Sequence, residues 1–334
     1  MLTFINVSAQ VGINNDATPP DSSAMLDVQS SNKGFLLPRM TIAERDNINN
    51  PANGLMFFCT DDNKFYAFIE VDNKWKALIF EDKSMTIPTM GYSTPTSYPN
   101  MTAVWADEFD GENLDTTNWN YQIGNGGRGN NELQYYKEEN TSLQNGCLII
   151  EAKEEVEGTS NYTSSRINTH NKVSLNYGRV GIRAVLPVGQ GIWPALWMLG
   201  DNIGTVGWPK CGEIDIMEMI GGNGQENKVH GTTHWWDDGF PASYGGSNTL
   251  ANGIFNDEFH VFTIEWDAQF IRWYVDDVQF HIIDITPPLL DELQKDFHFL
   301  MNIAVGGNWP GNPDGTTFFP QQLIVDYIRV FQDN

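Results

Sequence analysis

Three carboxylates stand close together in segment 213–218, whose sequence is EIDIME, and only apolar residues separate them. Adjacent carboxyl groups can serve as a general acid, a general base or a nucleophile. On a helix, at about 100° per residue, Glu213 and Glu218 would point well apart. On a strand they share a face with Asp215 only if a β-bulge inserts one residue, which we place at Met217. The spacing predicts a bulged strand with an acidic front and an apolar back.

The alternative is an acidic strip with a structural or ion-binding role. A solvated polar strand face usually has scattered basic partners, and Lys210 is the only base close by in the sequence. Clustered titratable groups without such partners are typical of functional sites. We therefore interpret the segment as part of an active site.

The composition narrows the class of partner. Of the 334 residues, 43 are acidic and 19 are basic, so the formal net charge is −24. This charge disfavours nucleic acids and anionic membranes, because both are bound through clustered Lys and Arg. It also mildly disfavours sulfated polymers. No segment approaches the roughly 18 apolar residues of a membrane span, and a neutral substrate fits best.

The chain divides into two parts joined by a linker. Residues 11–82 form a small module, and residues 101–334 form the larger domain. Residues 83–100, rich in Pro, Ser and Thr, are typical of a linker. Residues 1–10 resemble the end of a secretory signal, with an ordinary strand as the alternative, so we expect a secreted, periplasmic or cell-surface protein. Short strands are expected in the first part at 54–60, 64–70 and 74–80.

The larger domain contains many short β-prone segments separated by Gly, Asn and Pro. This pattern predicts an all-β fold, a sandwich or jelly roll of antiparallel sheets. A curved sheet of this kind would give the acidic strand a groove. Only residues 287–295 look helical. The clearest strands are expected at 148–153, 178–186, 261–266, 270–275, 299–305 and 323–331.

Tryptophans flank the acidic segment on both sides in the sequence. Indole rings suit the apolar faces of sugar rings, while carboxylates and amides bind the hydroxyl groups. Together with three carboxylates, they indicate a sugar substrate, with some of the rings serving as core. The tryptophans are Trp193, Trp197, Trp208, Trp235, Trp236 and Trp309.

Hydrolysis of a glycosidic bond in a retaining enzyme needs one carboxylate as nucleophile and a second, protonated carboxyl group as acid and then base. Glu213 and Glu218 are the candidates, and their spacing alone permits either order. Asp215 lies between them and is expected to keep their proton affinities apart.

The segment GEIDIME at 212–218 resembles the signature of glycoside hydrolase family 16 in its bulged form, which laminarinases, agarases and carrageenases share. The resemblance covers about residues 102–334 and is strongest to laminarinase-like endo-β-1,3-glucanases. It implies a concanavalin-like β-jelly roll, a long open cleft and retention of configuration, with Glu213 as nucleophile and Glu218 as acid/base. The supporting segments are WADEFD at 105–110, GNNELQYY at 129–136, IWPALWML at 192–199 and NIAVGGNWPG at 302–311.

The resemblance also implies substrate-binding roles. Hydroxyl groups on the non-reducing side would be bound by Asn130, Glu132 and Arg166. The remaining positions are Trp193 and Trp197 near the point of cleavage, Trp309 shaping the cleft, and His234 beside the acid/base. A surface ion pair for Arg166 and a loop position for His234 are the alternatives.

The family often holds a structural calcium ion on its convex side, and no cofactor is expected for catalysis. The matching donors are the backbone oxygens of Glu108 and Gly146 and the side chain of Asp326. Oxygen donors of this kind suit calcium. Alternatively, Asp326 pairs with Arg329.

The N-terminal part resembles a module of secreted Bacteroidetes surface proteins and fibre-like proteins. Its expected role is structural, in oligomerisation or surface association, and a carbohydrate-binding accessory module is the competing interpretation. The resemblance rests on segments 11–14, 23–28, 33–40 and 53–56.

The expected function is hydrolysis of internal β-1,3-glucosidic bonds in a neutral, laminarin-like β-glucan. Alternatives are a mixed-linkage β-glucanase, an agarase-like or carrageenase-like galactanase, and a non-catalytic glucan-binding protein. The presence of both glutamates favours an enzyme. Residues 191–246 contain only Lys210 and Lys228 as bases, and sulfated galactans would need clustered Arg or Lys.

Overall fold

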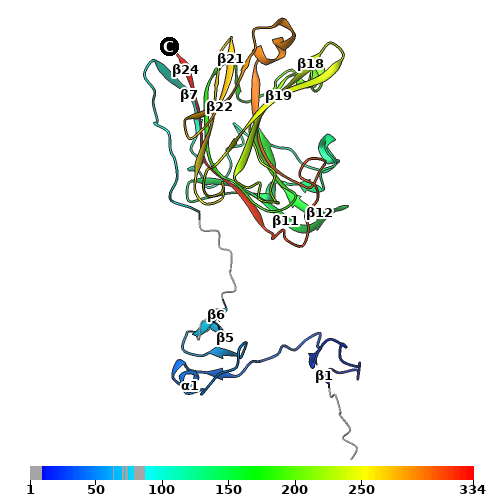
Figure 1. The fold of residues 1–334 in the computed structure, drawn as a ribbon. Helices are drawn as coiled ribbons and strands as arrows, with labels where there is room; N and C mark the ends of the chain where they lie inside the picture. The colour runs from blue at the N-terminus through cyan, green and yellow to red at the C-terminus, as the bar shows by residue number, and fades with distance from the viewer. Residues whose placement is uncertain (1–9, 63, 70, 72–73, 79–86) are drawn as a thin grey trace, which may run out of the picture. The chain divides into compact units, whose positions relative to one another are not determined.

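The computed structural model describes residues 10–62, 64–69, 71, 74–78 and 87–334. The chain divides into two compact units, Met1–Thr86 and Ile87–Asn334 (Figure 1). Nearly all of the predicted signal remnant, 1–10, lies outside the described residues. No helix among the described residues is long and apolar enough to cross a membrane.

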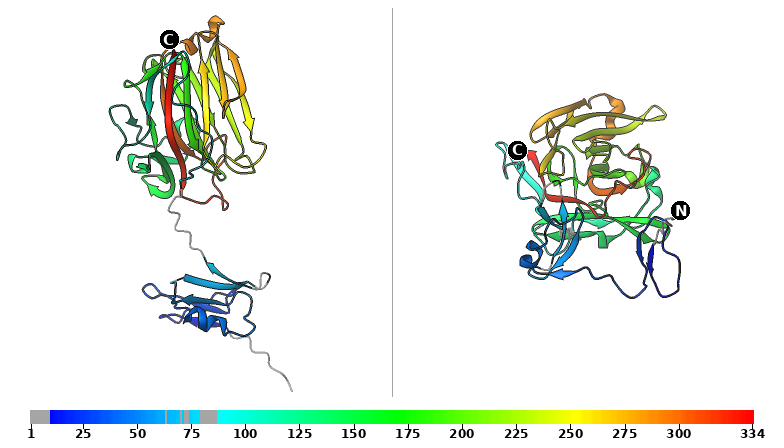
Figure 2. Two further views of the ribbon diagram at one scale, coloured as in Figure 1. Left: turned by 90° about the vertical axis from the view of Figure 1, so that its left-hand side faces the viewer. Right: turned by 60° about the horizontal axis from the view of Figure 1, so that its bottom comes forward.

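One sheet of the larger unit, here called the back sheet, has ten strands within 87–334. Its order is β22-β21-β20-β15-β24-β11-β12-β9, with β7 on β24 and β10 on β11. The last strand therefore pairs with the first strand of the unit, and Figure 2 shows the red β24 in the middle of this sheet. The strands are β7 (Met101–Asp107), β9 (Gln134–Tyr136), β10 (Thr141–Gln144), β11 (Cys147–Glu157), β12 (Ser160–Ser164), β15 (Gly178–Val185), β20 (His260–Trp266), β21 (Phe270–Val275), β22 (Val278–Asp284) and β24 (Gln321–Asp333).

The second sheet, here called the cleft sheet, has eight strands within 87–334 in the order β19-β18-β17-β16-β23-β13-β8, with β14 on β23. Strand β23 lies between β16 and β13 in this sheet and is buried along its whole length. The strands are β8 (Asn120–Tyr121), β13 (Arg166–Asn168), β14 (Ser174–Leu175), β16 (Ile192–Gly200), β17 (Glu213–Glu218), β18 (Lys228–Asp237), β19 (Phe240–Thr249) and β23 (Phe297–Val305).

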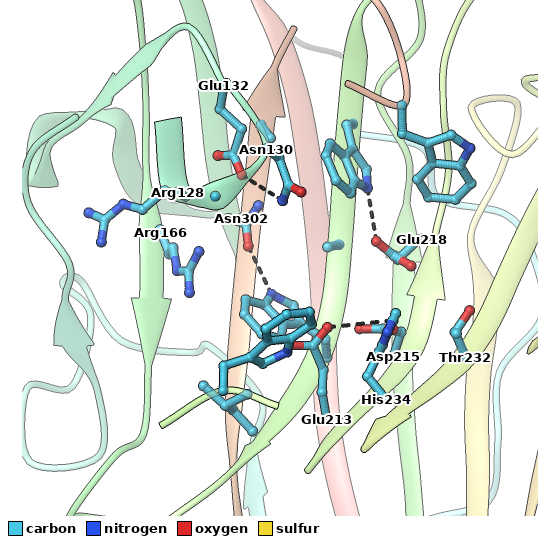
Figure 3. A pocket seen from close by; sticks show the side chains of 18 residues that line it. Arg128, Asn130, Glu132, Arg166, Glu213, Asp215, Glu218, Thr232, His234 and Asn302 are labelled. Atoms are coloured by element: carbon cyan, nitrogen blue, oxygen red, sulfur yellow. Dashed lines mark hydrogen bonds and ion pairs between the residues drawn. The ribbon is translucent and has the colours of Figure 1, made fainter. Parts of the chain in front are cut away.

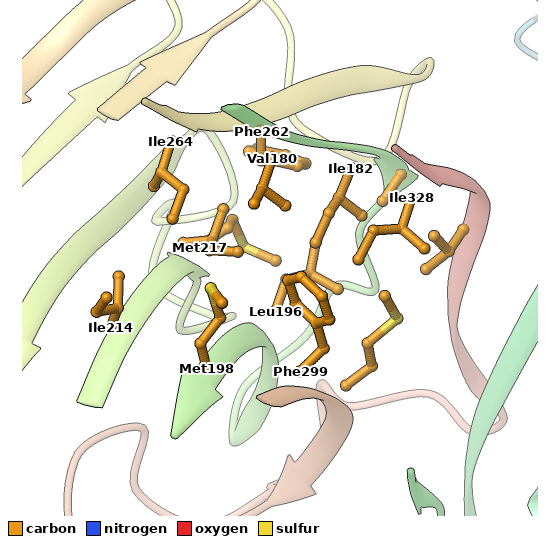
Figure 4. Close-up of a cluster of buried hydrophobic side chains, with 14 of the residues drawn as sticks. Val180, Ile182, Leu196, Met198, Ile214, Met217, Phe262, Ile264, Phe299 and Ile328 are labelled. Atoms are coloured by element: carbon orange, nitrogen blue, oxygen red, sulfur yellow. The ribbon is translucent and has the colours of Figure 1, made fainter. Parts of the chain in front are cut away.

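The core lies between the two sheets. Ile214 and Met217 of the cleft sheet belong to the same buried cluster as Val180, Phe262 and Ile264 of the back sheet (Figure 4). Burying these apolar faces against each other is the main stabilising contribution in such a sandwich. The expected all-β jelly roll is confirmed, and each of the strands predicted in this unit is present.

Helical segments are short in this unit. The predicted helix at 287–295 is a 3₁₀ segment, η4 (Pro288–Gln294), in which Leu290 has non-helical dihedral angles. The other segments are η2 (Gly127–Gly129), η3 (Glu138–Asn140) and α2 (Ile203–Val206).

The N-terminal unit contains a four-stranded sheet among its described residues, in the order β3-β4-β5-β6. The three predicted strands are present, except that residues 70 and 79–80 lie outside the described part. A short parallel pair, β1 with β2, carries exposed apolar side chains such as Val11 and Ile13. The elements are β1 (Val11–Ile13), β2 (Leu26–Val28), β3 (Arg39–Met40), α1 (Ile42–Asp46), β4 (Met56–Cys59), β5 (Lys64–Ile69) and β6 (Lys74–Leu78).

The predicted linker at 83–100 is wrong for residues 87–100, which pack on the larger unit. Gly91 forms a β-bridge with Phe259, and a Cβ on Gly91 would lie 2.1 Å from the backbone oxygen of Phe259. The amide of the buried Thr94 donates a hydrogen bond of 2.9 Å to the hydroxyl oxygen of Tyr327, and Oγ1 of Thr94 shares a second hydrogen bond of 2.8 Å with the same hydroxyl group. Pro, Ser and Thr predict a lack of regular structure, and they do not exclude an extended segment held by such contacts.

Candidate active site

β17 carries the three carboxylates and contains the expected bulge. Leu196 of β16 pairs with Met217, while the next residue, Trp197, pairs with Asp215. Ile216 is therefore the residue without a partner, one position before the predicted Met217. The register between β17 and β18 shifts over the same residues.

The bulge sends two successive side chains into the core. Ile216 and Met217 are both buried there. As a result Glu213, Asp215 and Glu218 line the opposite face of the sheet, as the spacing predicted.

The back sheet supports the bulge from behind. The indole Nε1 of Trp273, in β21, donates a hydrogen bond of 2.8 Å to the backbone oxygen of Asp215. Gly231 of β18 leaves the space for this ring, because a Cβ at Gly231 would lie 2.4 Å from Cδ1 of Trp273. This indole therefore supplies a hydrogen-bond donor for the Asp215 carbonyl, which lies next to the bulge, where the regular hydrogen bonds between the strands are interrupted.

A cavity of about 580 Å³ lies over the carboxylates. Figure 3 shows Glu132, Asn130 and Arg166 on one side of it, and Glu213 with His234 on the other. The lining residues are Arg128, Gly129, Asn130, Glu132, Arg166, Trp193, Ala195, Trp197, Leu199, Trp208, Glu213, Asp215, Glu218, Thr232, His234, Asn302, Ala304 and Trp309. The structure therefore brings together every predicted catalytic and sugar-binding residue.

Glu218 is largely enclosed by its surroundings and accepts one hydrogen bond. Nε1 of Trp193 donates a hydrogen bond of 3.0 Å to Oε1 of Glu218. Burial raises the pKa of Glu218 to about 8, with a further rise from the neighbouring Asp215. A carboxyl group with this pKa is mostly protonated at neutral pH and can donate a proton.

Glu213 and Asp215 form a coupled pair beside an imidazole. Burial, and then the charge of Asp215, raise the pKa of Glu213, while His234 opposes this rise. Nε2 of His234 lies 3.2 Å from Oδ2 of Asp215 and 3.7 Å from Oε1 of Glu213. Trp208 donates a hydrogen bond of 3.1 Å to Oε2 of Glu213. The imidazole and the indole donor act against this rise, yet the pKa of Glu213 is still raised to about 8, as it is for Glu218.

The implied place of His234 beside the acid/base Glu218 is wrong. In the register of β17 with β18, His234 lies opposite Glu213, and His230 lies opposite Glu218. Because of the bulge, Glu213 and Glu218 are five residues apart in β17, whereas the residues opposite them in β18 are only four apart. His230 packs against Trp309, with ring centroids 5.1 Å apart.

Polar groups gather on the side of the cavity formed by β13 and the loop after η2. Oε2 of Glu132 accepts hydrogen bonds from Gln134 and Tyr136, at 2.7 and 3.2 Å. Asn130 contacts Oε1 of the same carboxylate at 3.4 Å. The surface-pair alternative for Arg166 is wrong, since its guanidinium lies over the ring of Trp197 at 4.7 Å within the cavity.

For several residues of the cavity, the sequence predicted no individual role. Asn302 accepts a hydrogen bond of 2.9 Å from Trp197 and comes from β23, within a segment already noted for its resemblance. Arg128 lies in a glycine-rich loop, where no pattern indicated its direction. Trp208 was among the flanking tryptophans, whereas Trp235 is a core residue. Thr232 had no signal at all.

The predicted calcium donors lie at the back sheet. Oδ2 of Asp326 pairs with Arg183 at 2.7 Å, and Oδ1 faces Sγ of Cys147 at 3.9 Å. The alternative pairing of Asp326 with Arg329 is wrong, because Arg329 pairs with the side chain of Glu108. Oδ1 and neighbouring backbone oxygens have the right chemistry for calcium, which needs about six to eight oxygens, so a calcium ion here stays a prediction.

Comparison with known proteins identifies the class. Residues 129–329 match the sequence model of Glycosyl hydrolases family 16. A beta-glucanase of Rhodothermus marinus is 42% identical over an alignment of 262 residues that covers 73% of this chain and 89% of that protein. A glucan endo-1,3-beta-glucosidase of Cryptopygus antarcticus is 34% identical over 67% of this chain and 90% of that protein.

A solved structure agrees with these relatives. The laminarinase catalytic domain from Thermotoga maritima MSB8 is 47% identical, with a TM-score of 0.67 over 71% of this chain and 100% of that chain. The chain belongs to glycosyl hydrolases family 16 and is a glycoside hydrolase. Separately, residues 12–100 match a model described as a phage tail like trimerisation region.

Proposed function

We propose that the protein is a retaining endo-β-1,3-glucanase that hydrolyses a neutral, laminarin-like β-glucan. The observation that carries this proposal is the bulged strand β17, which presents Glu213, Asp215 and Glu218 together in a tryptophan-lined cavity. The relatives, a glucan endo-1,3-beta-glucosidase and a laminarinase among them, support the β-1,3 linkage.

In the first step, an oxygen of Glu213 attacks the anomeric carbon and the bond to the leaving sugar breaks. Glu218 gives its proton to the leaving oxygen, so that a covalent glycosyl-enzyme forms. In the second step, Glu218 takes a proton from water, the water oxygen bonds to the anomeric carbon, and Glu213 is released. The pKa of both glutamates is raised to about 8, so the support for this order of roles is the position of His234, 3.7 Å from Glu213 and opposite it in the strand register.

Asp215 and His234 would position and tune Glu213 rather than react. Oδ2 of Asp215 is buried and has no hydrogen-bond partner, although His234 lies close to it. A negative charge on this oxygen raises the pKa of Glu213, and a proton on it removes that effect, because the two carboxyl groups interact. Trp208 and Trp309, 52% and 41% exposed, offer ring surfaces at the cavity opening for further sugar units.

The direct test is the hydrolysis of laminarin followed by NMR spectroscopy of the new ends. We expect a mixture of oligosaccharides from early time points, with new ends that are initially in the β-configuration. New ends in the α-configuration would exclude the double displacement, and release of glucose alone would exclude endo-action.

One observation favours a second class of substrate, a galactan with sulfate or carboxylate substituents. Arg128 and Arg166 both line the cavity, and the buried Nε atom of each has no hydrogen-bond partner. They lie outside residues 191–246, so counting bases there underestimates the positive charge of the cleft. Guanidinium groups of this kind suit sulfate or carboxylate substituents. Parallel assays with laminarin, lichenan, agarose and carrageenan distinguish a neutral glucan from a mixed-linkage glucan or a galactan.

For the N-terminal unit we propose assembly of copies of this chain. The match to a trimerisation region supports this role, as do the exposed Val11, Ile13 and Leu26 on a two-stranded sheet. Such a small sheet has little stability by itself and gains from a partner surface. Light scattering of the full chain and of residues 87–334 is expected to give a trimer and a monomer, and a monomeric full chain would contradict the proposal.

Secretion and a structural calcium ion complete the proposal. A polymeric substrate is met outside the cytoplasm, which supports a secreted or surface location.

For calcium, we expect that a chelator lowers the midpoint of thermal unfolding and that Asp326→Asn removes this sensitivity, whereas equal midpoints with and without chelator would exclude the site.

A further inference from the structure

A second group of metal-binding side chains lies on the cleft sheet, apart from the three carboxylates. His170 follows β13, Asp201 follows β16, and His298 lies in β23. One donor atom from each of these residues lies within 4.8 Å of the other two. None of the three is among the residues that line the cavity over Glu213 and Glu218.

The three side chains are already in contact. Nδ1 of His298 lies 2.9 Å from Oδ1 of Asp201, and Nε2 of His170 lies 3.2 Å from the backbone oxygen of Asp201. The two imidazole rings have centroids 4.5 Å apart. The side chain of His298 is 2% exposed and that of Asp201 is 28% exposed, so the group is reached from the Asp201 side.

Surrounding contacts fix the backbone of the group. The amide of His170 donates to Oδ1 of Asn168 at 3.0 Å. Oγ1 of Thr169 accepts a hydrogen bond of 3.0 Å from the amide of Phe299, next to His298. The amide of Asp201 donates to the backbone oxygen of Asp296 at 2.8 Å. Three separate strands are therefore held in position before any ion arrives, which lowers the cost of binding.

We propose that His170, Asp201 and His298 bind a divalent transition-metal ion of the zinc type, outside the catalytic cavity. Two imidazole nitrogens and one carboxylate form a donor set that zinc accepts, with water completing the coordination. Bonds of about 2.0–2.1 Å require donor atoms roughly 3.3 Å apart, which rotation of the partly exposed His170 and Asp201 achieves. Calcium and magnesium prefer oxygen donors and fit this group poorly.

A bound ion would join three strands of the cleft sheet to the segment before β17. Asp201 begins the connection 201–212, which carries Trp208, the donor to Glu213. The ion is therefore expected to stabilise the fold and this connection, and to change the rate of hydrolysis little. A hydrogen-bonded chain of the same three side chains is the alternative without a metal.

Isothermal titration calorimetry and thermal unfolding test the proposal. The full chain, without a histidine tag and freed of metal by a chelator, is titrated with ZnCl₂, and MgCl₂ serves as the comparison. We expect one zinc ion per chain and a raised unfolding midpoint, neither seen with magnesium. His170→Ala and Asp201→Asn are expected to weaken zinc binding by about tenfold or more.

Two controls separate this group from other sites. His260 forms an equally short pair with Asp276, at 2.7 Å, and the variant His260→Asn is expected to bind zinc as the wild type does. Glu213, Asp215 and His234 form the other candidate group among the described residues, so Glu213→Gln must also keep the zinc effect. Absence of a zinc effect in the wild type, unchanged binding in His170→Ala, or loss of binding in Glu213→Gln would overturn the proposal.

Discussion

The two ends of β17 carry the same side chain in different surroundings. At one end, Glu213 accepts a hydrogen bond from Trp208 and lies near the carboxylate of Asp215 and the imidazole of His234. At the other end, Glu218 accepts a single hydrogen bond from Trp193 in a buried setting. Burial raises the pKa of both glutamates, and the imidazole, which pairs with Glu213, favours the charged form there. The difference shows how one strand can present a nucleophile and an acid from identical residues.

The largest expected effect comes from removing either carboxyl group. Glu213→Gln and Glu218→Gln should each lower kcat on laminarin by several orders of magnitude, about 10⁴-fold, with the fold retained. An aryl glycoside with a good leaving group needs no proton, so it should still form the glycosyl-enzyme with Glu218→Gln but not with Glu213→Gln. Mass spectrometry of the trapped intermediate measures this, and the opposite pattern would reverse the two roles.

The bulge that separates the two ends can be disturbed from behind. Gly231→Ala would place a methyl group 2.4 Å from the ring of Trp273, and so displace the donor to the Asp215 carbonyl. We expect a loss of about 10²-fold in kcat/KM and a lower unfolding midpoint, since both ends of β17 depend on this geometry. Gly315→Ala, where nothing lies within 4 Å of the added Cβ, is the control and should behave as the wild type.

Deleting Met217 should restore plain alternation, so that Glu218 stays on the face of Glu213 and Asp215 but loses the position and direction that the bulge gives it, and hydrolysis should fall. A deletion variant with normal hydrolysis would show that the bulge has no catalytic importance.

The two indole donors should affect opposite sides of the pH profile. The hydrogen bond from Trp193 lowers the pKa of Glu218, so Trp193→Phe should raise that pKa and move the alkaline limit of kcat/KM to higher pH. Trp208→Phe removes a donor to Glu213, so it should move the acidic limit to higher pH. We expect rate losses of about tenfold in both variants. Equal shifts of the same limit would mean that the two ends are not distinct.

The smallest effect concerns stability. Burial raises the pKa of Glu218 from its usual 4.5 to about 8, so the folded state binds its proton more tightly than the unfolded state. Ionising Glu218 in the folded state therefore lowers the free energy of unfolding. This loss of stability is absent below pH 4.5, grows between pH 4.5 and pH 8, and is complete above pH 8. Glu218→Gln should therefore raise the free energy of unfolding at pH 9 by about 1 to 3 kcal/mol. No difference from the wild type is expected at pH 4, and chemical denaturation at both pH values measures this.

Local sequence predicted much of this site because the relevant pattern is local. The alternation of Ile214, Asp215 and Ile216 defines the two faces of a strand, and the extra residue before Glu218 requires a bulge. The strands of the jelly roll follow from similar short patterns. The contacts at 87–100 were missed because an extended segment without periodicity gives no local signal for packing.

Partners across the sheet were less predictable. The place of His234 opposite Glu213 follows from strand register, which depends on where the bulge lies in the neighbouring strand. The arginines Arg128 and Arg166 line the same cavity as the carboxylates but come from segments far away in the sequence, so a count of bases around β17 missed them.

The sequence by itself determined the three carboxylates, the bulge between them and the apolar back of their strand, because a side-chain period of two allows few alternatives. Only the tertiary structure decided which end of β17 receives the imidazole, which indole reaches each glutamate, and that Trp273 crosses from the other sheet to Asp215. These are contacts between strands distant in the chain. Register, sheet stacking and burial set them, and no short segment contains that information.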